Sequence, residues 1–506
     1  MTTIADLPTP SLILDRGKLV RNIERLASRL RGTGVMLRPH LKTAKSIDVA
    51  RLALQGGAGA ATVSTLKEAQ IFGQHGITDL LYAVQLSPQK LADVTFLRRQ
   101  GVDLKVVVDS VAAADMVSAH AIATNDPMPC FIEIDVDGHR AGIRPDESQA
   151  IVDVGRAIAR GAHLAGVMTH AGESYDLSTP QALARAAESE RAGAVRAAEA
   201  LRNAGLDCPI VSIGSTPTAH ALENFEGVTE IRAGVYMFGD LVQVGIGVCA
   251  VEDIALSVLT TVIGHQKEKG WILVDCGWTA MSGDRGTASQ EKDYQLGLVT
   301  DEAGVPMHEV VLLRAYQEHG IVALQPGGNA TLPDLPVGAR IRILPNHACA
   351  TGAQHELYHV VQGKQVIAHW PRFNGWAIDT RAAPNLTIVS AAAVRATARR
   401  KDASDAVAAA FRAMSNDNAT LFPVVNAVIE APNTAFTIKS GVNREQGIVG
   451  VKIGSYWPRN SERFGLANHN STTLLLDKDT GAPRALVNAR ELNGLRTAAA
   501  NAVATS

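Results

Sequence analysis

A lysine at the end of an apolar run is the first residue whose position could support chemistry. Lys42 lies in the stretch 38–45 (RPHLKTAK), between an apolar run that predicts a strand over 35–40 and a helical pattern that begins at Ser46. A lysine at such a strand end can form a Schiff base, provided that burial or nearby cations lower the pKa of its amine. Arg38, His40 and Lys45 could supply these cations. The alternative is an ordinary surface lysine in a loop.

Small and hydroxyl-bearing residues follow two later apolar runs. Gly214, Ser215 and Thr216 come directly after the run 210–214, and Gly234 and Tyr236 come after the run 229–234. Hydroxyls, backbone N–H groups and glycines that allow close approach are what a phosphate requires. Each segment alone could be a turn. Together with Lys42 they indicate an aldehyde cofactor with a phosphate tail, which is pyridoxal 5′-phosphate.

A His-x-Cys pair follows another predicted strand, 340–344. In extended backbone, His347 and Cys349 point to the same face. Imidazole and thiolate are suitable ligands for Zn²⁺ or another transition metal, and two protein ligands leave room for water or a substrate oxygen. The alternative is a loop histidine beside a buried cysteine. The residue types also permit Mg²⁺ or Mn²⁺ through solvent-filled positions.

The elements that position these residues alternate between strands and helices. Eight apolar runs are separated by alanine-rich amphipathic stretches, a pattern that predicts a closed (β/α)₈ barrel. The expected strands are 35–40, 61–65, 79–84, 104–109, 131–135, 164–170, 210–214 and 229–234. Active sites of such barrels lie at the carboxyl ends of the strands, which is where Lys42 and the hydroxyl-rich segment fall.

The pattern changes twice along the chain. We expect the barrel over 20–240 and a β domain over 1–19 and 241–376, with strands at 256–263, 271–274, 340–344, 355–361 and 366–370. The short strand near Ser11 is expected to join this domain. Residues 377–385 are typical of a linker, and 386–506 begin a further α+β segment that closes with a helix over 490–504.

Composition excludes several classes of function. The chain has 506 residues, 19% of them charged, and a formal net charge of −2 without a basic block. This favours neither nucleic acid nor a membrane surface as a partner. Five cysteines without a C-x-x-C motif indicate a reducing compartment, and no signal peptide is visible, so we expect a cytoplasmic protein.

Residues 1 to about 376 resemble the D-threonine aldolase/D-serine dehydratase family, which binds pyridoxal phosphate on an alanine racemase-like barrel (fold type III). The shared motifs are RPHLKTAK, EIDVDGHRAG, THAGESY, VSIGSTPT, EIRAGVY, QEHG and PNHACAT. Several of them are most similar to members that dehydrate D-threo-3-hydroxyaspartate.

The resemblance assigns roles to individual residues. It implies Lys42 as the Schiff-base lysine and catalytic base, and a cofactor site formed by Lys42, Arg140, His170, Tyr175, Gly214, Ser215, Thr216, Gly234 and Tyr236. Arg140 is expected near the pyridine nitrogen. His347 and Cys349 become catalytic ligands of a divalent metal, and the family forms homodimers in which β-domain residues reach the neighbouring active site.

The implied reaction is the dehydration of a D-β-hydroxy amino acid, with D-threo-3-hydroxyaspartate as the first choice and D-serine as a further substrate. Family aldolases tend to carry Asp at the position of Cys349, so the His-x-Cys pair favours a dehydratase over the alternative, retro-aldol cleavage to glycine and an aldehyde. A second alternative is a protein that binds pyridoxal phosphate without catalysis.

Residues 386–506 resemble the N-terminal part of the ornithine cyclodeaminase/μ-crystallin family through VGVK at 449–452 and LRTAA at 495–499. By analogy, Lys452 and Arg496 would contact a substrate carboxylate. The Rossmann half of that family would begin beyond Ser506, so we expect an incomplete domain without redox activity of its own. Dehydration of 3-hydroxyaspartate passes through iminosuccinate, an imine that a complete relative of this segment could reduce.

Overall fold

The computed structural model describes residues 2–55, 59–138, 140–380, 386–429 and 433–505. By internal contacts the chain divides into two compact units, Met1–Ile378 and Asp379–Ser506. The predicted linker 377–385 spans this division, and its residues 381–385 lie outside the described residues, as does His139 of the DGHRAG motif.

Eight parallel strands form one sheet in the larger unit, in the order β2-β9-β8-β7-β6-β5-β4-β3. A parallel bridge between His40 and Thr62 connects the segment after β2 to β3, so the two edges of the sheet meet. This confirms the expected alanine racemase-like barrel, and each predicted strand overlaps an observed one. The strands are β2 (Met36–Leu37), β3 (Ala61–Val63), β4 (Asp79–Tyr82), β5 (Asp103–Val108), β6 (Pro129–Ile134), β7 (His163–Thr169), β8 (Ile210–Ile213) and β9 (Glu230–Ile231).

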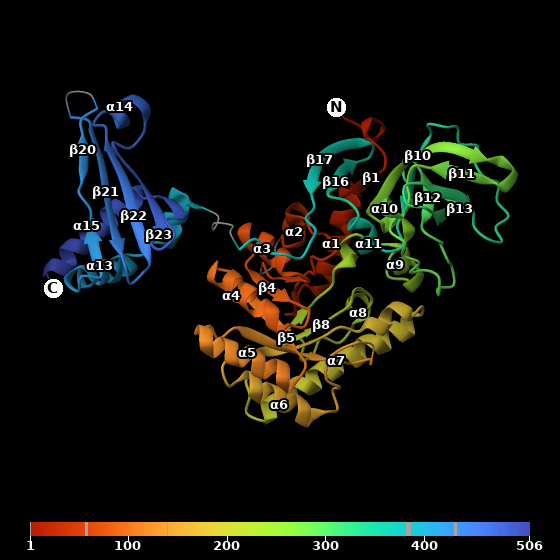
Figure 1. Cartoon of the computed structure of the whole chain (residues 1–506), viewed down its shortest axis with the longest axis horizontal. Coiled ribbons are helices and arrows are strands. Elements are labelled where there is room, and N and C mark those ends of the chain that lie inside the picture. The colour runs from red at the N-terminus through yellow and green to blue at the C-terminus, as the bar shows by residue number, and fades with distance from the viewer. Residues whose placement is uncertain (1, 56–58, 139, 381–385, 430–432, 506) are drawn as a thin grey trace. The chain divides into compact units, whose positions relative to one another are not determined.

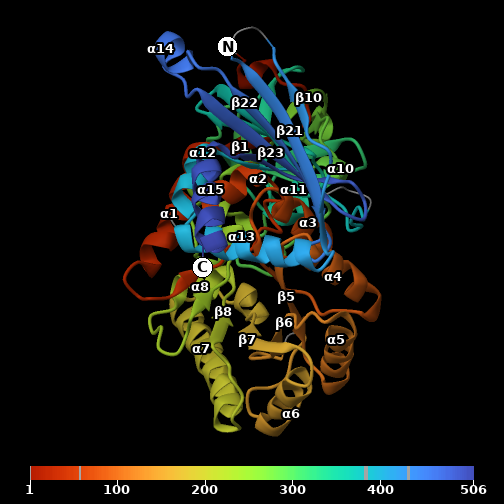
Figure 2. The ribbon, with the colours of Figure 1, turned by 90° about the vertical axis from the view of Figure 1, so that its left-hand side faces the viewer.

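Helices cover the outside of these strands, as Figures 1 and 2 show for α5, α6 and α7. In α1, Leu19, Ile23, Leu26 and Leu30 are buried at intervals of three and four residues, and Asp15 caps the helix by accepting from Lys18 N. The barrel helices are α1 (Arg16–Leu30), α2 (Ile47–Ala53), α3 (Leu66–Gln74), α4 (Leu91–Arg99), α5 (Val111–Thr124), α6 (Ser148–Ile158), α7 (Pro180–Asn203) and α8 (Thr216–Ala221).

The β domain is built on a second sheet of nine strands. Their order is β11-β14-β13-β12-β15-β10-β1-β16-β17, and β10 also pairs with β11. Ser11–Asp15 (β1) pairs with β10, as expected for the strand near Ser11. The other strands are β10 (Leu256–Gln266), β11 (Trp271–Val274), β12 (Leu298–Asp301), β13 (Pro306–Ala315), β14 (Gly320–Leu324), β15 (Arg340–Leu344), β16 (Leu357–Gln362) and β17 (Gln365–Pro371), with short helices α9 (Leu241–Ile246), α10 (Trp278–Met281) and α11 (Ala348–Gly352).

The smaller unit is a mixed sheet with helices, in the order β18-β24-β23-β22-β21-β19, and β20 also pairs with β21. Figure 2 shows α12, α13 and α15 on one face of this sheet. The elements are β18 (Thr387–Val389), α12 (Ala391–Thr397), α13 (Arg400–Ser415), β19 (Ala419–Leu421), β20 (Val425–Ala427), β21 (Ala435–Asn443), β22 (Ile448–Tyr456), α14 (Asn460–Phe464), β23 (His469–Asp477), β24 (Pro483–Asn488) and α15 (Arg490–Thr505). Among the described residues of the whole chain, no helix is both long and apolar enough to cross a membrane.

Candidate active site

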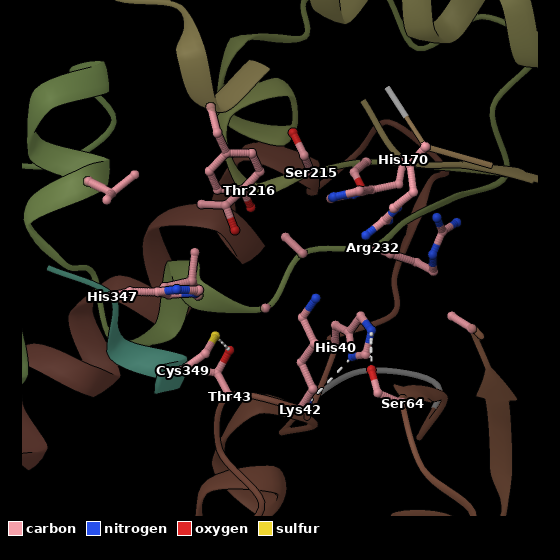
Figure 3. Close-up of a pocket in the computed structure, with 18 of the residues that line it drawn as sticks. His40, Lys42, Thr43, Ser64, His170, Ser215, Thr216, Arg232, His347 and Cys349 are labelled. Atoms are coloured by element: carbon pink, nitrogen blue, oxygen red, sulfur yellow. Dashed lines mark hydrogen bonds between the residues drawn. The ribbon is translucent and has the colours of Figure 1, made fainter. Parts of the chain in front are cut away.

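A cavity of about 670 Å³ lies where the carboxyl ends of the barrel strands face the β domain. The predicted site residues come together in its wall with one exception, Tyr236. Those that line it are Lys42, Arg140, His170, Tyr175, Gly214, Ser215, Thr216, Gly234, His347 and Cys349. Figure 3 shows the Lys42 side chain extending into the middle of this group, with Ser215 and Thr216 across the cavity.

The surroundings of Lys42 differ from those expected from its own motif. Arg38 is fully buried at the base of the barrel, where it pairs with Glu230 and Asp79 at 2.8 Å each, and Lys45 pairs with Glu68. Neither lines the cavity, so the prediction that they supply cations to Lys42 is wrong. The reason is the alternation of the strand and the turn that follows it, which send these two side chains away from Lys42.

Two half-buried histidines beside Lys42 are held neutral. Burial, together with the charges of Lys42 and Arg140, lowers the pKa of His170 to about 3. Burial also lowers the pKa of His40 well below its ordinary value, assisted by Lys42 and Arg232. The cations that accompany Lys42 in the cavity wall are therefore the guanidinium groups of Arg140 and Arg232.

The segment 214–218 has the construction of an anion-binding loop. Gly214 has φ +125°, and a Cβ there would lie 2.5 Å from Arg232 O, so only glycine fits. Ser215 caps α8 by accepting from Thr218 N. The Thr216 hydroxyl is buried and has no hydrogen-bond partner of ordinary geometry in the described part of the chain. A hydroxyl of this kind, in a cavity wall, is matched by a phosphate oxygen.

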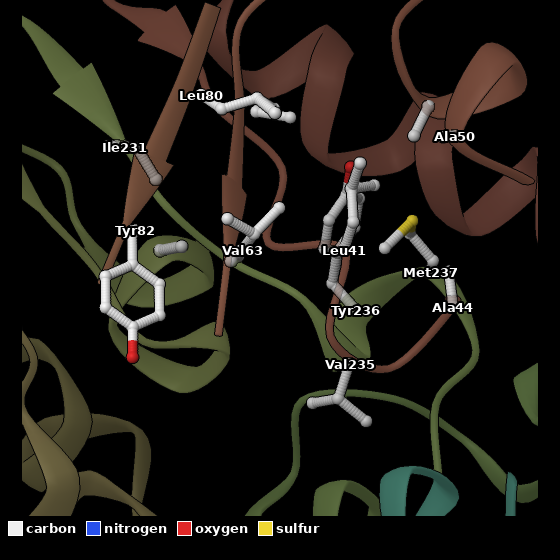
Figure 4. Close-up of a cluster of buried hydrophobic side chains, with 14 of the residues drawn as sticks. Leu41, Ala44, Ala50, Val63, Leu80, Tyr82, Ile231, Val235, Tyr236 and Met237 are labelled. Atoms are coloured by element: carbon white, nitrogen blue, oxygen red, sulfur yellow. The ribbon is translucent and has the colours of Figure 1, made fainter. Parts of the chain in front are cut away.

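Backbone proximity also explains Gly234, where a Cβ would meet His40 O at 2.8 Å. Tyr236 differs from its prediction. The short helix Val235–Met237 turns its side chain into the core beside Leu41 and Met237, as Figure 4 shows, and it does not line the cavity. Its hydroxyl is buried without a partner among the described residues. In this structure, the residue predicted to donate to a phosphate thus lies behind the cavity wall.

His347 and Cys349 lie together on the opposite side of the cavity from Arg232 (Figure 3). Their backbone is extended only at His347, which is the N-cap of α11, because Cys349 lies in the first turn of that helix. The prediction of extended backbone is therefore wrong for Cys349, yet both side chains line the cavity. Cys349 Sγ is 2.9 Å from Thr43 Oγ1.

The pKa values of His347 and Cys349 are shifted by the Asp284 carboxylate and by the contact between the two side chains. Burial by itself lowers the pKa of His347, but the Asp284 carboxylate, 3.0 Å from Nδ1, and the Cys349 sulfur raise it to about 11. Burial raises the pKa of Cys349, and the hydrogen bond and charge of His347 bring it below its ordinary value. Imidazole and a thiol that is readily ionised are the donors that a divalent metal takes, so this pair fits a metal. No cluster of three or more His, Cys, Asp or Glu ligands occurs among the residues that the structure describes.

Three residues shape the site without having been predicted to belong to it. Arg232, 3% exposed, donates to Ser212 Oγ and to Thr169 O. Glu190 on α7 accepts from Ala171 N and Gly214 N at 3.0 Å each. Asp284 lies in a Ser-Gly-Asp-Arg-Gly segment that the sequence alone explains as a turn. Of these three residues, only Arg232 could have been assigned to the site from the sequence, because it lies shortly before Gly234 at the end of a predicted strand.

Three family models match the chain. The alanine racemase N-terminal domain matches residues 14–242, the putative serine dehydratase domain matches 255–361, and the ornithine cyclodeaminase/mu-crystallin family matches 385–506. The last match agrees with the resemblance inferred for the C-terminal segment.

Among curated proteins, D-threo-3-hydroxyaspartate dehydratase of Delftia sp. (strain HT23) is 52% identical over 379 residues, which cover 74% of this chain and 99% of that protein. The solved structure of that dehydratase has a TM-score of 0.73 to this chain and is covered over 100% of its length. A further structure of the same dehydratase is a mutant in the metal-free form.

Two relatives from Paracoccus denitrificans mark other activities. A 3-hydroxy-D-aspartate aldolase from strain Pd 1222 is 28% identical over 378 residues, which cover 72% of this chain and 92% of that aldolase. An iminosuccinate reductase from strain Pd 1222 is 41% identical over 101 residues, which cover 20% of this chain and 31% of that reductase.

The fold, the composition of the cavity and these similarities agree over the larger unit. Identity of 52% over nearly the whole length of a relative, on the same alanine racemase-like barrel, shows common family membership. The chain therefore belongs to the D-threonine aldolase/D-serine dehydratase family of pyridoxal phosphate-dependent enzymes, which includes D-threo-3-hydroxyaspartate dehydratase.

Proposed function

We propose that the larger unit is a dehydratase of D-β-hydroxy amino acids, with D-threo-3-hydroxyaspartate as its main substrate and oxaloacetate and ammonia as products. D-serine is proposed as a further substrate. The observation that carries the proposal is the convergence of Lys42, the loop 214–216 and the pair His347 and Cys349 on one cavity. The 52% identity to a dehydratase of this substrate supports the same reaction.

The residues of the cavity fit the cofactor. Lys42 would hold its aldehyde, and Gly214, Ser215, Thr216 and Gly234 would surround its phosphate, where the buried Thr216 hydroxyl has no other partner of ordinary geometry among the described residues. When bound, pyridoxal phosphate binds the substrate amine covalently and withdraws electrons from Cα. Arg140, His170 and Tyr175 stay as predicted contacts of the ring, with Arg232 as an additional buried cation.

The chain's own residues then have separable tasks. Lys42, once free, removes the proton from Cα of the substrate. His40 and His170 stay neutral beside it, so they add no positive charge that would oppose protonation of Lys42. His347 and Cys349 would hold a divalent metal, Zn²⁺, Mg²⁺ or Mn²⁺, whose Lewis acidity assists the departure of the β-hydroxyl.

The test separates the dehydratase from the aldolase alternative. The protein, supplied with pyridoxal phosphate and a divalent metal, is incubated with D-threo-3-hydroxyaspartate, D-serine and D-threonine. Ammonia and a 2-oxo acid, with a large loss in Cys349→Ala, are the expected result. Glycine and an aldehyde as main products would show an aldolase, and cofactor binding without turnover would indicate the non-catalytic alternative.

The proposal includes a cytoplasmic homodimer. The turn 316–319 between β13 and β14 carries an exposed Tyr316 stacked on His319 at 4.8 Å, and it does not line the cavity of its own chain. We propose that it faces the partner subunit. Sedimentation velocity should then give the mass of two chains, and a monomer at enzymatically active concentrations would contradict this part of the proposal.

A further inference from the structure

Gln243 in α9 is a buried residue in the wall of the larger cavity to which the proposed mechanism gives no task. It is 1% exposed, and both polar atoms of its amide, Oε1 and Nε2, have no hydrogen-bond partner among the described residues. A buried amide without partners is costly in free energy, so such a group in a cavity wall points to a ligand that satisfies it. Its position in the site indicates which part of a substrate it would meet.

The start of α9 is fastened to the turn that carries the proposed metal ligands. Asp240, the N-cap of α9, accepts from Gln243 N with one carboxylate oxygen and from Ala348 N with the other, at 3.0 Å each. Ala348 is the residue between His347 and Cys349. Two backbone hydrogen bonds also join the two segments, from Leu241 N to Pro345 O and from Val242 N to Asn346 O. The backbone of Gln243 is therefore fixed beside the metal pair.

The proposed reaction defines which substrate group lies beside this pair. The pair serves the β-hydroxyl, and in 3-hydroxyaspartate the carbon that bears this hydroxyl also bears the side-chain carboxylate. A group that recognises the carboxylate must therefore lie next to the pair. The residues that line the cavity from α9, its N-cap and the segment 284–286 are Asp240, Val242, Gln243, Asp284 and Gly286. Of these five, only Gln243 has a side-chain N–H group that can donate a hydrogen bond.

We propose that Gln243 determines specificity for the side-chain carboxylate of the substrate, to which its Nε2 donates. The inference rests on the proposed function, which fixes the substrate's orientation toward the metal pair. An amide suits this place because it donates without a charge, whereas a lysine or arginine would be drawn into an ion pair with Asp240 or Asp284. D-serine has no side-chain carboxylate and would leave the amide unpaired, so Gln243 would favour 3-hydroxyaspartate over D-serine.

The experiment compares two ligands that lack the β-hydroxyl and therefore cannot be dehydrated. D-aspartate has the side-chain carboxylate, and D-alanine has none. Each is titrated into the whole chain loaded with pyridoxal phosphate and a divalent metal, and binding is followed by the cofactor absorbance. Gln243→Met keeps the length of the side chain and removes the donor. The Kd of D-aspartate should then rise at least about tenfold, because a hydrogen bond to a charged group is lost, and that of D-alanine should stay within about twofold.

Gln243→Glu is a second variant of the same size, and its carboxylate should weaken D-aspartate binding even more while sparing D-alanine. The matched control is Gln100→Met, at the exposed end of α4 and outside the cavity, which should change neither titration. Circular dichroism confirms that each variant is folded. Unchanged D-aspartate binding in the Gln243 variants, an equal loss for D-alanine, or no preference of the original chain for D-aspartate would each overturn the proposal. Glycine and an aldehyde as reaction products, with both titrations as expected, would overturn only the proposed dehydration.

Discussion

At the scale of single residues, Glu190 connects the two loops that flank the proposed phosphate site. One carboxylate oxygen accepts from Ala171 N, next to His170, and from Gly214 N, next to Ser215. Since the side chain is buried, its removal leaves both N–H groups without a partner. We expect Glu190→Ala to weaken pyridoxal phosphate binding at least about tenfold, measured by titration of the cofactor absorbance.

Glu190→Gln tests whether position or charge matters. The amide oxygen can accept the same two bonds, so cofactor affinity should stay within about threefold of the original. Burial raises the pKa of Glu190, so the folded chain keeps this proton to a higher pH than the unfolded chain. The stability that this proton contributes is present at low pH and lost as pH rises through the folded pKa. Glu190→Gln should reduce that loss in urea unfolding, and an unchanged pH profile would contradict the assignment.

Asp284 is predicted to orient His347 for the metal. Its carboxylate is 3.0 Å from Nδ1, which leaves Nε2 as the nitrogen available for a ligand. Loss of such a partner typically weakens metal binding by about 10–100-fold. We expect Asp284→Asn to raise the metal concentration needed for half-maximal activity by this factor, with activity restored at saturating metal. A kcat that stays low at saturating metal would show that Asp284 has another task.

At this scale the sequence predicted which residues belong to the site better than it predicted what their side chains contact. Lys42 and the loop 214–216 lie in one cavity as expected, because a barrel gathers the carboxyl ends of its strands. The pair at 347 and 349 lines the same cavity from the β domain, where only the family resemblance had placed it at this site. Tyr236 and Arg38 did not follow their motifs, because one backbone turn decides whether a side chain faces the cavity or the core. Asp284 and Glu190 come from elements distant in sequence, and no local pattern marks them.

At the scale of elements, Arg38 joins four strands at the seam of the barrel. It extends from the end of β2 to Glu230 on β9 and Asp79 on β4, and its Nη1 is 3.4 Å from Ala61 O on β3. Because Arg38 and Glu230 are buried, removing one of these two leaves the charge of the other uncompensated. We expect Arg38→Met to lower the free energy of unfolding of the larger unit by about 3–5 kcal/mol.

The double variant Arg38→Met with Glu230→Leu checks the cause. When both charges are absent, less buried charge remains unpaired, so the double variant should be less destabilised than the sum of the two single variants. Urea unfolding followed by far-UV circular dichroism provides the measurement. Additive losses would show that packing, and not the ion pair, accounts for the effect.

The sequence predicted the helices and strands in which apolar residues follow a regular pattern. Buried parallel strands such as β5 contain a short apolar run, here 106–108, and helices such as α1 bury apolar residues at intervals of three and four. The start of α11 was missed because Ala348–Gly352 is little more than one turn long, so no periodicity could develop. His347, its N-cap, and Cys349 nevertheless line the cavity.

At the scale of the whole molecule, all residues that line the larger cavity lie between His40 and Cys349, within the unit Met1–Ile378. The Delftia dehydratase corresponds to this unit over 99% of its own length. We therefore expect a chain of residues 1–378 to fold and to keep kcat/KM within about twofold of the whole chain, since a twofold change is less than about 0.5 kcal/mol of transition-state stabilisation. The measurement is steady-state release of 2-oxo acid, with circular dichroism to confirm folding. A folded 1–378 chain with much lower kcat/KM would contradict this prediction. It would mean that residues 379–506 contribute to catalysis at the active site of the larger unit.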